Sequence, residues 1–343
     1  MNKIFTLILI LLSSIVCYAT VRTVNNNNPS PGQFATLLSA HNASSPGDTI
    51  YISGTFFNYG GLNVSKRLVI IGTGHNPQKQ VPLVSQMDWI TFTSTAAKNT
   101  RIYGVNLFGI NCSVSDVDSI YIERCKIRHR IELHTISSCS HWYIQGNYFE
   151  RNDGTPNIYL GNNSHNWFVI RNNIFNGPLQ ELNFNQNADI YLLNNIFLYS
   201  GSAMMGSVYG IFFYNNIFYR ASPSPSTVGC TWQSNLSYQC SNNTFPTGGG
   251  NSGNLPNTDP QFVNFPIAGA YFSYAHNFNL QSSSPAKNAG NDGKDIGITG
   301  GDIYFEQNGI PSIPQIREFN ITSNNNIAPG GSLQINIKST IKK

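Results

Sequence analysis

The stretch Leu193-Asn194-Asn195-Ile196-Phe197 is one copy of a short phrase that recurs along the chain and decides the fold. Related copies are centred on Asn106, Cys125, Asn147, Asn173, Asn216 and Asn243. Successive centres are 19 to 27 residues apart, and periods in this range are typical of stacked repeat folds. The sequence therefore predicts a solenoid rather than a set of globular domains.

Alternating apolar residues precede most copies, as Ile190 and Leu192 precede Asn195. Alternation indicates a strand with one buried face. The central Asn is expected at a corner, where a left-handed or bridge conformation suits it, and an apolar residue turns inward again after it. The remaining length of each period leaves room for a third strand. One repeat is thus one coil of a parallel β-helix.

Stacked coils place equivalent side chains above one another at about the 4.7–4.9 Å strand spacing. We expect a ladder of amide hydrogen bonds and, two residues later, a stack of Phe rings. The predicted ladder consists of Asn147, Asn173, Asn195, Asn216 and Asn243, and the predicted ring stack of Phe149, Phe175, Phe197 and Phe218.

Four regions are predicted: a signal sequence in residues 1–19, an N-terminal cap in 20–47, a parallel β-helix of about ten coils in 48–300, and an extension in 301–343. The first region has a positive start at Lys3, an apolar run and a small residue, Ala19, at its end. We expect a secreted or cell-surface protein, with a lipid anchor at Cys17 as the alternative. The mature chain is expected to have no transmembrane segment and to be a monomer.

Only 10% of the residues are charged, and the formal net charge is +4. The Lys and Arg residues form no dense cluster, so nucleic acid is not an expected partner. Among the cysteines, Cys230 and Cys240 are the best candidates for a disulfide, whereas Cys125 stands in a ladder position and is expected to be a buried thiol.

Both ends of the predicted solenoid have recognisable segments. Residues 34–40 have the apolar spacing of a short helix and lead into Pro46-Gly47-Asp48-Thr49, while Asp259-Pro260-Gln261-Phe262, Ser284-Pro285-Ala286 and Asp295-Ile296-Gly297 follow the repeats. This arrangement resembles secreted right-handed parallel β-helix proteins of the pectin-lyase-like superfamily. The resemblance implies an all-β, right-handed, single-stranded parallel β-helix with a capping helix. Beyond it, residues 316–321 and 333–337 alternate as two further strands.

Outward positions of the third strand offer a candidate site. Counting back from each following repeat gives an outer stripe of Glu132, His134, Asn157, Tyr159, Glu181 and Asn183, with Arg130 just before it. Polar groups beside an aromatic ring suit an extended sugar chain. In a lyase, Arg130 would neutralise a uronate carboxylate, His134 would take the α-proton and Tyr159 would protonate the leaving oxygen. Glu132, Asn157, Glu181 and Asn183 would bind the substrate.

Several family motifs are missing. Asn257-Thr258-Asp259 matches one element of the polygalacturonase-like pattern but lacks its partners, and the arginine and calcium-binding aspartate signatures of pectate-lyase-like proteins are absent. No cofactor is expected, with calcium as the alternative left open. No metal site is expected either, because the spacing of Cys125, His129, His134, Cys139 and His141 fits no tight zinc pair. We therefore expect a protein that binds extracellular polysaccharide. The alternatives are a lyase acting on a uronate-containing glycan and a structural or adhesive surface protein.

Overall fold

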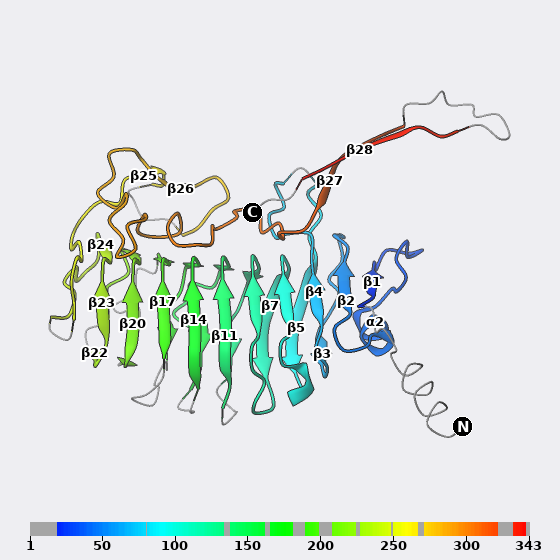
Figure 1. Ribbon diagram of the computed structural model, residues 1–343, viewed down its shortest axis with the longest axis horizontal. Coiled ribbons are helices and arrows are strands. Elements are labelled where there is room, and N and C mark those ends of the chain that lie inside the picture. The colour runs from blue at the N-terminus through cyan, green and yellow to red at the C-terminus, as the bar shows by residue number, and fades with distance from the viewer. Residues whose placement is uncertain are drawn as a thin grey trace, which may run out of the picture.

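The computed structural model describes residues 19–79, 81–133, 138–161, 165–180, 189–198, 208–223, 227–247, 250–266, 271–321 and 332–340. They form a parallel β-solenoid of about seven turns with almost no helix (Figure 1). The predicted all-β solenoid is confirmed. Residues 1–18 of the predicted signal sequence lie outside the described residues.

The first strands of the coils lie in a parallel sheet of ten strands, in which spatial order follows chain order and whose first member, at residues 21–24, precedes the helix at the N-terminal end. Its inward side chains are buried, as Ile190 and Leu192 are in β17, while Tyr191 between them is only half-buried. The strands are β1 (Val21–Val24), β2 (Thr49–Ile52), β4 (Val69–Ile71), β6 (Arg101–Tyr103), β8 (Tyr121–Glu123), β11 (Ser140–Gln145), β14 (Asn166–Arg171), β17 (Ile190–Leu193), β20 (Ile211–Tyr214) and β23 (Thr231–Gln233).

The second and third strands of each coil join a twelve-stranded sheet, because the long strand β7 pairs with β9 through one half and with β10 through the other. The third-strand branch holds β10 (Ile131–Glu132), β13 (Ile158–Tyr159) and β16 (Leu179–Gln180). The other strands are β3 (Leu62–Val64), β5 (Gln86–Phe92), β7 (Asn106–Cys112), β9 (Lys126–Ile127), β12 (Tyr148–Phe149), β15 (Ile174–Phe175), β18 (Ile196–Phe197), β21 (Ile217–Tyr219) and β24 (Leu236–Tyr238).

The remaining elements are short. They are the helix α2 (Leu37–Ala43), the 3-10 turn η1 (Thr95–Ala97), and the paired strands β19 (Val208–Tyr209) with β22 (Thr227–Val228), β25 (Phe262–Asn264) with β26 (Asn277–Leu280), and β27 (Gln315–Ile321) with β28 (Ile335–Thr340). Helix α2 begins after Thr36, whose side chain accepts a hydrogen bond from the Ser39 amide, and it buries Leu37 and Ala40. The predicted capping helix is confirmed. The two predicted strands after residue 310 form a hairpin that projects from the body (Figure 1).

A left-handed residue turns the chain between the two sheets. This corner row consists of Gly104, Arg124, Gly146, Asn172, Asn194, Asn215, Ser234 and Gly253, with φ from 51° to 65°. Gly and Asn reach this conformation at the lowest cost. The sequence analysis placed the central Asn at the corner, and the structure corrects this: the corner is the residue before it.

The residue after each corner points inward and forms the ladder. Asn147, Asn173, Asn195 and Asn216 have no exposed surface. The Oδ1 atom of each later member accepts hydrogen bonds from the backbone N–H and the Nδ2 of the member before it, at 2.9–3.0 Å. Each Nδ2 also donates to a backbone carbonyl oxygen, at 2.7–2.9 Å. Every polar atom of these buried amides is therefore satisfied.

The two ends of the ladder differ from the prediction. Cys125 begins it as a fully buried thiol whose backbone N–H donates to Asn147 Oδ1, and burial raises its pKa to about 12. Asn235 and Asn254 continue it, with Asn216 donating to Asn235 Oδ1 at 3.0 Å. The prediction for Asn243 is wrong, because this side chain bonds only to the backbone of Cys240, three residues away.

The last two residues of the phrase also point in opposite directions. The rings of Phe149, Phe175, Phe197 and Phe218 stack inside the coil at centroid distances of 4.5, 5.2 and 4.8 Å. The preceding residues, Ile174, Ile196 and Ile217, face outward and yet are fully buried. They pack in a second apolar cluster with residues of the C-terminal segment, among them Phe262, Phe272, Phe278 and Ile296.

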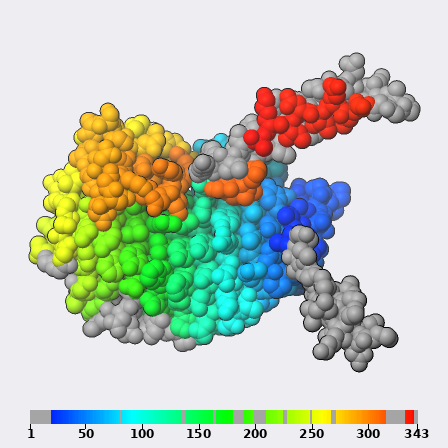
Figure 2. Space-filling model, in the orientation of Figure 1, coloured from blue at the N-terminus to red at the C-terminus, as the bar shows by residue number. Residues whose placement is uncertain are grey.

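Residues 256–266 and 271–311 lie along one side of the solenoid and add no coils to it, as Figure 2 shows in yellow to orange. Within them, residues 286–311, here called the strap, run back across the corner row. Asn215 and Asn291 exchange hydrogen bonds of 2.9 Å, Asn172 Nδ2 donates to the Gly300 carbonyl oxygen at 2.9 Å, and Arg124 Nη1 donates to Ile310 O at 3.0 Å. The expected ten coils are therefore too many.

The five described cysteines are buried free thiols, so the predicted disulfide is wrong. Cys230 lies just before β23, where its sulfur accepts from the Ile211 amide. Cys240 follows β24, and its thiol donates to backbone carbonyl oxygens of Phe218 and Ala221 at 3.3 and 3.2 Å. The two cysteines are close in sequence, but strands β23 and β24 lie between them and keep their sulfur atoms apart.

Candidate functional site

Part of the predicted third-strand stripe is assembled. Glu132 and Tyr159 are register partners in β10 and β13, and the Arg130 guanidinium lies 5.6 Å from the centroid of the Tyr159 ring. However, Arg130 already forms an ion pair within the protein, because its Nη2 lies 2.7 Å from Glu132 Oε2. A cation neutralised in this way is poorly prepared to receive a uronate carboxylate.

Other members of that stripe are placed differently. Asn157 is fully buried, where its Nδ2 donates to Arg151 O at 3.1 Å and its Oδ1 accepts from Gly177 N at 2.8 Å. The expectation that it faces solvent is wrong, because this amide holds the turn between coils. His134, Glu181 and Asn183 lie outside the described residues.

The register of the next coil also differs. Leu179 is the inward partner of Ile158, so Gln180 takes the place beside Tyr159 that counting back from the next repeat gave to Glu181 or Asn183.

An aromatic and charged cluster surrounds this stripe. Trp89, Phe108 and His129 contact one another, with ring centroids 4.8 to 5.5 Å apart. Burial, followed by the charge of Arg151, lowers the pKa of His129. Arg151 forms hydrogen bonds to both carboxylate oxygens of Asp153 and lowers the pKa of that group. The charges on this face thus satisfy one another.

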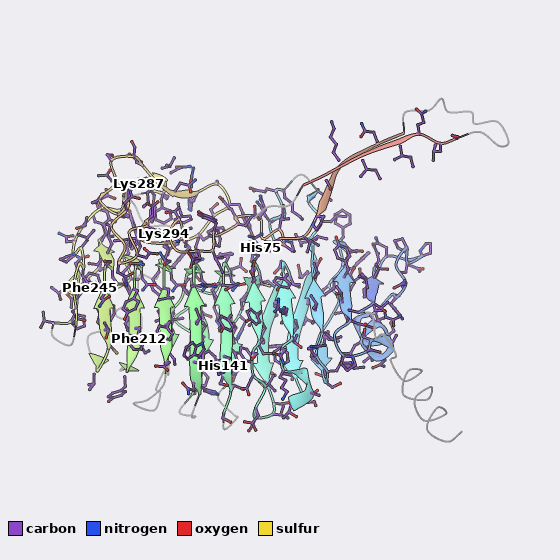
Figure 3. All side chains as sticks on the ribbon, viewed as in Figure 1. His75, His141, Phe212, Phe245, Lys287 and Lys294 are labelled. Atoms are coloured by element: carbon purple, nitrogen blue, oxygen red, sulfur yellow. The ribbon has the colours of Figure 1, made fainter. Side chains whose placement is uncertain are left out.

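The outer face of the ten-stranded sheet carries a more regular surface, the aromatic stripe, which we define as Tyr121, Tyr143, Trp167, Tyr191 and Phe212. Tyr121 and Tyr143 are register partners whose rings are 4.5 Å apart and 7° from parallel. Tyr191 and Phe212 repeat this arrangement at 4.9 Å and 12°. Figure 3 labels Phe212, together with His141 at the start of β11, on this face.

Trp167 contacts one of the two ring pairs. Between them the same row is occupied by Val169 of β14, which has no ring. Trp167, two residues earlier, has a left-handed φ of 52° and is 37% exposed. Its ring meets Tyr191 edge-on at 5.9 Å and stacks on His141 at 5.7 Å. The four rings of the row therefore form two separate pairs, one on β8 and β11 and one on β17 and β20, and Trp167 links the second pair to His141 of β11.

A hollow of about 540 Å³ adjoins the stripe where Tyr121 ends it. Its lining comes from the starts of successive strands and consists of Gly47, Arg67, Val69, Asn99, Arg101, Ser119 and Tyr121. Arg101 precedes Tyr121 in the same row, and its guanidinium lies 4.8 Å from the centre of that ring. The hollow contains two arginines and no acidic residue.

The sequence analysis missed the stripe although a signal for it was present. Tyr121, Tyr143, Tyr191 and Phe212 each stand between the two alternating apolar residues that precede a repeat, for example Tyr191 between Ile190 and Leu192. The alternation was read for its inward side chains, while the outward residue between them is aromatic in four coils.

No protein-family model matches the chain, and no curated protein matches it. Within the described residues there is no cluster of three or more His, Cys, Asp or Glu side chains that could hold a metal ion. The part of the chain that the structure describes contains no helix long and apolar enough to cross a membrane.

Proposed function

We propose that this chain is a secreted or cell-surface protein that binds an extended polysaccharide along the outer face of its ten-stranded sheet. The observation that carries the proposal is the aromatic stripe, with its two pairs of nearly parallel rings, Tyr121 with Tyr143 and Tyr191 with Phe212. Pyranose rings have apolar C–H groups that pack on aromatic surfaces, and half-buried rings offer such a surface at little entropic cost. The two rings of each pair cover one face of each other, so the sugar would contact their outward edges and the faces that remain open.

The stripe also suits a linear ligand. Four of the five rings, those other than Trp167, occupy one register row, so their spacing follows that of the strands and the row runs along the solenoid axis. Burial raises the pKa values of Tyr121 and Tyr191, so both hydroxyls stay protonated at neutral pH. The rings that the sugar chain would contact are therefore uncharged and include hydroxyl donors, and the charged Arg101 lies at the Tyr121 end of the row. The predicted signal sequence and the resemblance to secreted parallel β-helix proteins agree with an extracellular role.

The lyase alternative has weaker support. It needs Arg130 to be free for a substrate carboxylate, whereas Arg130 is paired with Glu132. It also needs polar neighbours on the third strand, of which Asn157 is buried. We therefore favour binding without catalysis.

Affinity electrophoresis and calorimetry with a panel of neutral and acidic polysaccharides test the proposal. Tyr143→Ala and Phe212→Ala are each expected to weaken binding about tenfold or more, as the loss of an aromatic anchor does. Phe56→Ala, an 88% exposed ring in another part of the molecule, is the matched control. Tyr159→Ala separates the two faces: if it abolishes binding while Tyr143→Ala does not, the ligand lies on the third-strand face and the proposal is wrong.

A further inference from the structure

We propose that the hollow beside Tyr121 is an anion subsite, in which Arg67 and Arg101 hold a carboxylate or sulfate group of the bound glycan. This inference rests on the proposed function and names the class of ligand, an acidic polysaccharide. It also fixes one end of the bound chain, since the hollow lies at the N-terminal end of the aromatic stripe.

The two arginines converge from successive coils. Arg101 opens β6 and is exposed, and Arg67 lies two residues before β4. Arg67 rests against Gly47, where an added Cβ atom would lie 2.8 Å from its Nη2 atom. Gly47 has a left-handed φ of 99°. A glycine at this position thus leaves room for the guanidinium at the edge of the hollow.

Nearby carboxylates already have other partners. Asp48 is buried, accepts from the amides of Thr20 and Ser45, and pairs with Arg22 at 3.4 Å. Asp118 Oδ1 accepts two hydrogen bonds from Ser140. Among the described residues, no acidic side chain forms an ion pair with either arginine of the hollow.

The other outer face shows the opposite arrangement. There Arg130 pairs with Glu132, Arg151 with Asp153, and Arg128 approaches Asp88 at 4.0 Å. An incoming anion would have to displace an internal carboxylate on that face, but not in the hollow. Guanidinium groups bind carboxylate and sulfate through charge-assisted, often bidentate hydrogen bonds.

The position of Tyr121 distinguishes a glycan from a free ion. The Arg101 guanidinium covers one face of the Tyr121 ring at 4.8 Å, and the Tyr143 ring covers the other at 4.5 Å, so a sugar would contact Tyr121 at its outward edge and hydroxyl. A sugar residue in that position would carry its acidic substituent toward Arg101, so contact with Tyr121 and ion pairing would act on the same residue. A small inorganic anion can use only the arginines, so its binding should be weaker.

The test compares ligands with one backbone and different charges: cello-oligosaccharides, carboxymethyl cellulose and cellulose sulfate, with inorganic sulfate as the free anion. We expect the wild-type chain to bind at least one charged polymer about tenfold more tightly than the neutral one, with an advantage that shrinks as salt is raised. Arg67→Gln with Arg101→Gln should reduce that affinity to the neutral level. Arg220→Gln, an arginine after β21 and outside the hollow, is the control. Circular dichroism checks that each variant is folded.

Each outcome separates this inference from the proposed function. Equal affinity for neutral and charged polymers in the wild-type chain, with loss in Tyr143→Ala, overturns the anion subsite and leaves glycan binding standing. Binding that depends on Arg67 and Arg101 but is unaffected by Tyr143→Ala and Phe212→Ala supports the subsite and overturns the stripe. Inorganic sulfate that binds as tightly as the polymers shows a free-anion site and overturns the glycan assignment. Failure of every ligand to bind overturns both.

Discussion

The two asparagines of each Asn-Asn-Ile-Phe phrase are neighbours in sequence and have opposite roles. Asn195 points inward, where it is fully buried and bonds to identical residues in the coils before and after it. Asn194 points outward at a left-handed corner, and its Nδ2 donates to carbonyl oxygens of Asp295 and Gly297 in the strap. The inner amide thus repeats a single bonding pattern, while the outer one binds a segment that has no repeat. We call the ladder the inner row and the corner row the outer row. Replacing a residue of the inner row should therefore lower the stability of the fold more than replacing a residue of the outer row.

The largest loss in the free energy of unfolding is expected when a ladder asparagine of the inner row is replaced. Asn195→Ala removes the acceptor of the Asn173 backbone N–H and Nδ2, both in a fully buried site. Unsatisfied buried donors cost about 1–3 kcal/mol each, so we expect a loss of about 3 kcal/mol in the free energy of unfolding, measured with urea. Asn243→Ala is the control from outside the ladder. A loss for Asn243→Ala as large as that for Asn195→Ala would contradict the assignment of the inner row.

A loss of folding stability at acid pH is expected from His75, which lies where the strap contacts the early coils. His75 is buried beside the strap, with its amide donating to Asn308 O, and burial followed by the charges of Lys126 and Lys79 lowers its pKa from 6.5 to about 3. Between about pH 6.5 and pH 3, His75 is protonated in the unfolded chain but stays neutral in the folded chain. Stability should therefore fall as the pH drops from 6.5 toward 3, by up to about 1.4 kcal/mol for each pH unit.

His75→Gln isolates this contribution, because carboxylates with lowered pKa values are common to both proteins. Urea unfolding between pH 7 and pH 4.5 should show a shallower decline for the variant. Parallel declines in the two proteins would show that this ring does not titrate between the folded and unfolded states.

The smallest effect is expected in the outer row. Asn194→Gly removes the two donations to the strap and keeps the left-handed corner accessible. We expect a loss of about 1 kcal/mol, because the substitution removes the donor itself and the Gly297 carbonyl oxygen keeps a second donor, the Gly300 N–H. Hydrogen exchange should rise in residues 295–300 before it rises in the ladder. Faster exchange in the ladder itself would show that the two rows do not act separately.

Much of this fold could be predicted because its information is local and repeated. Alternation around Ile190 and Leu192 gave the first strand, and the recurring Asn gave four members of the ladder. The errors came at the ends, where the pattern weakens. The sequence around Asn243 ends in Phe245 and matches the phrase better than that around Asn235, yet only Asn235 follows a left-handed corner.

The candidate sites and the strap were harder to predict for different reasons. The aromatic stripe is local information that was read for the wrong face of the strand. The pairing of Arg130 with Glu132 and the burial of Asn157 depend on side-chain geometry that polarity alone does not specify. The strap joins residues as distant as Asn172 and Gly300, and a contact between a repeat and a non-repeating segment leaves no period to detect.

The strap has a consequence for how the molecule comes apart. A stack whose coils touch only their neighbours can fray from either end, one coil at a time. Here one segment is fastened to the coil of Asn215, to that of Asn172 and, through Asn308, to that of His75. Opening any one of these coils must therefore also break the hydrogen bonds that the strap makes to it, while the strap stays bound to the others. Unfolding of these coils should therefore be more cooperative than in a solenoid whose coils contact only their neighbours.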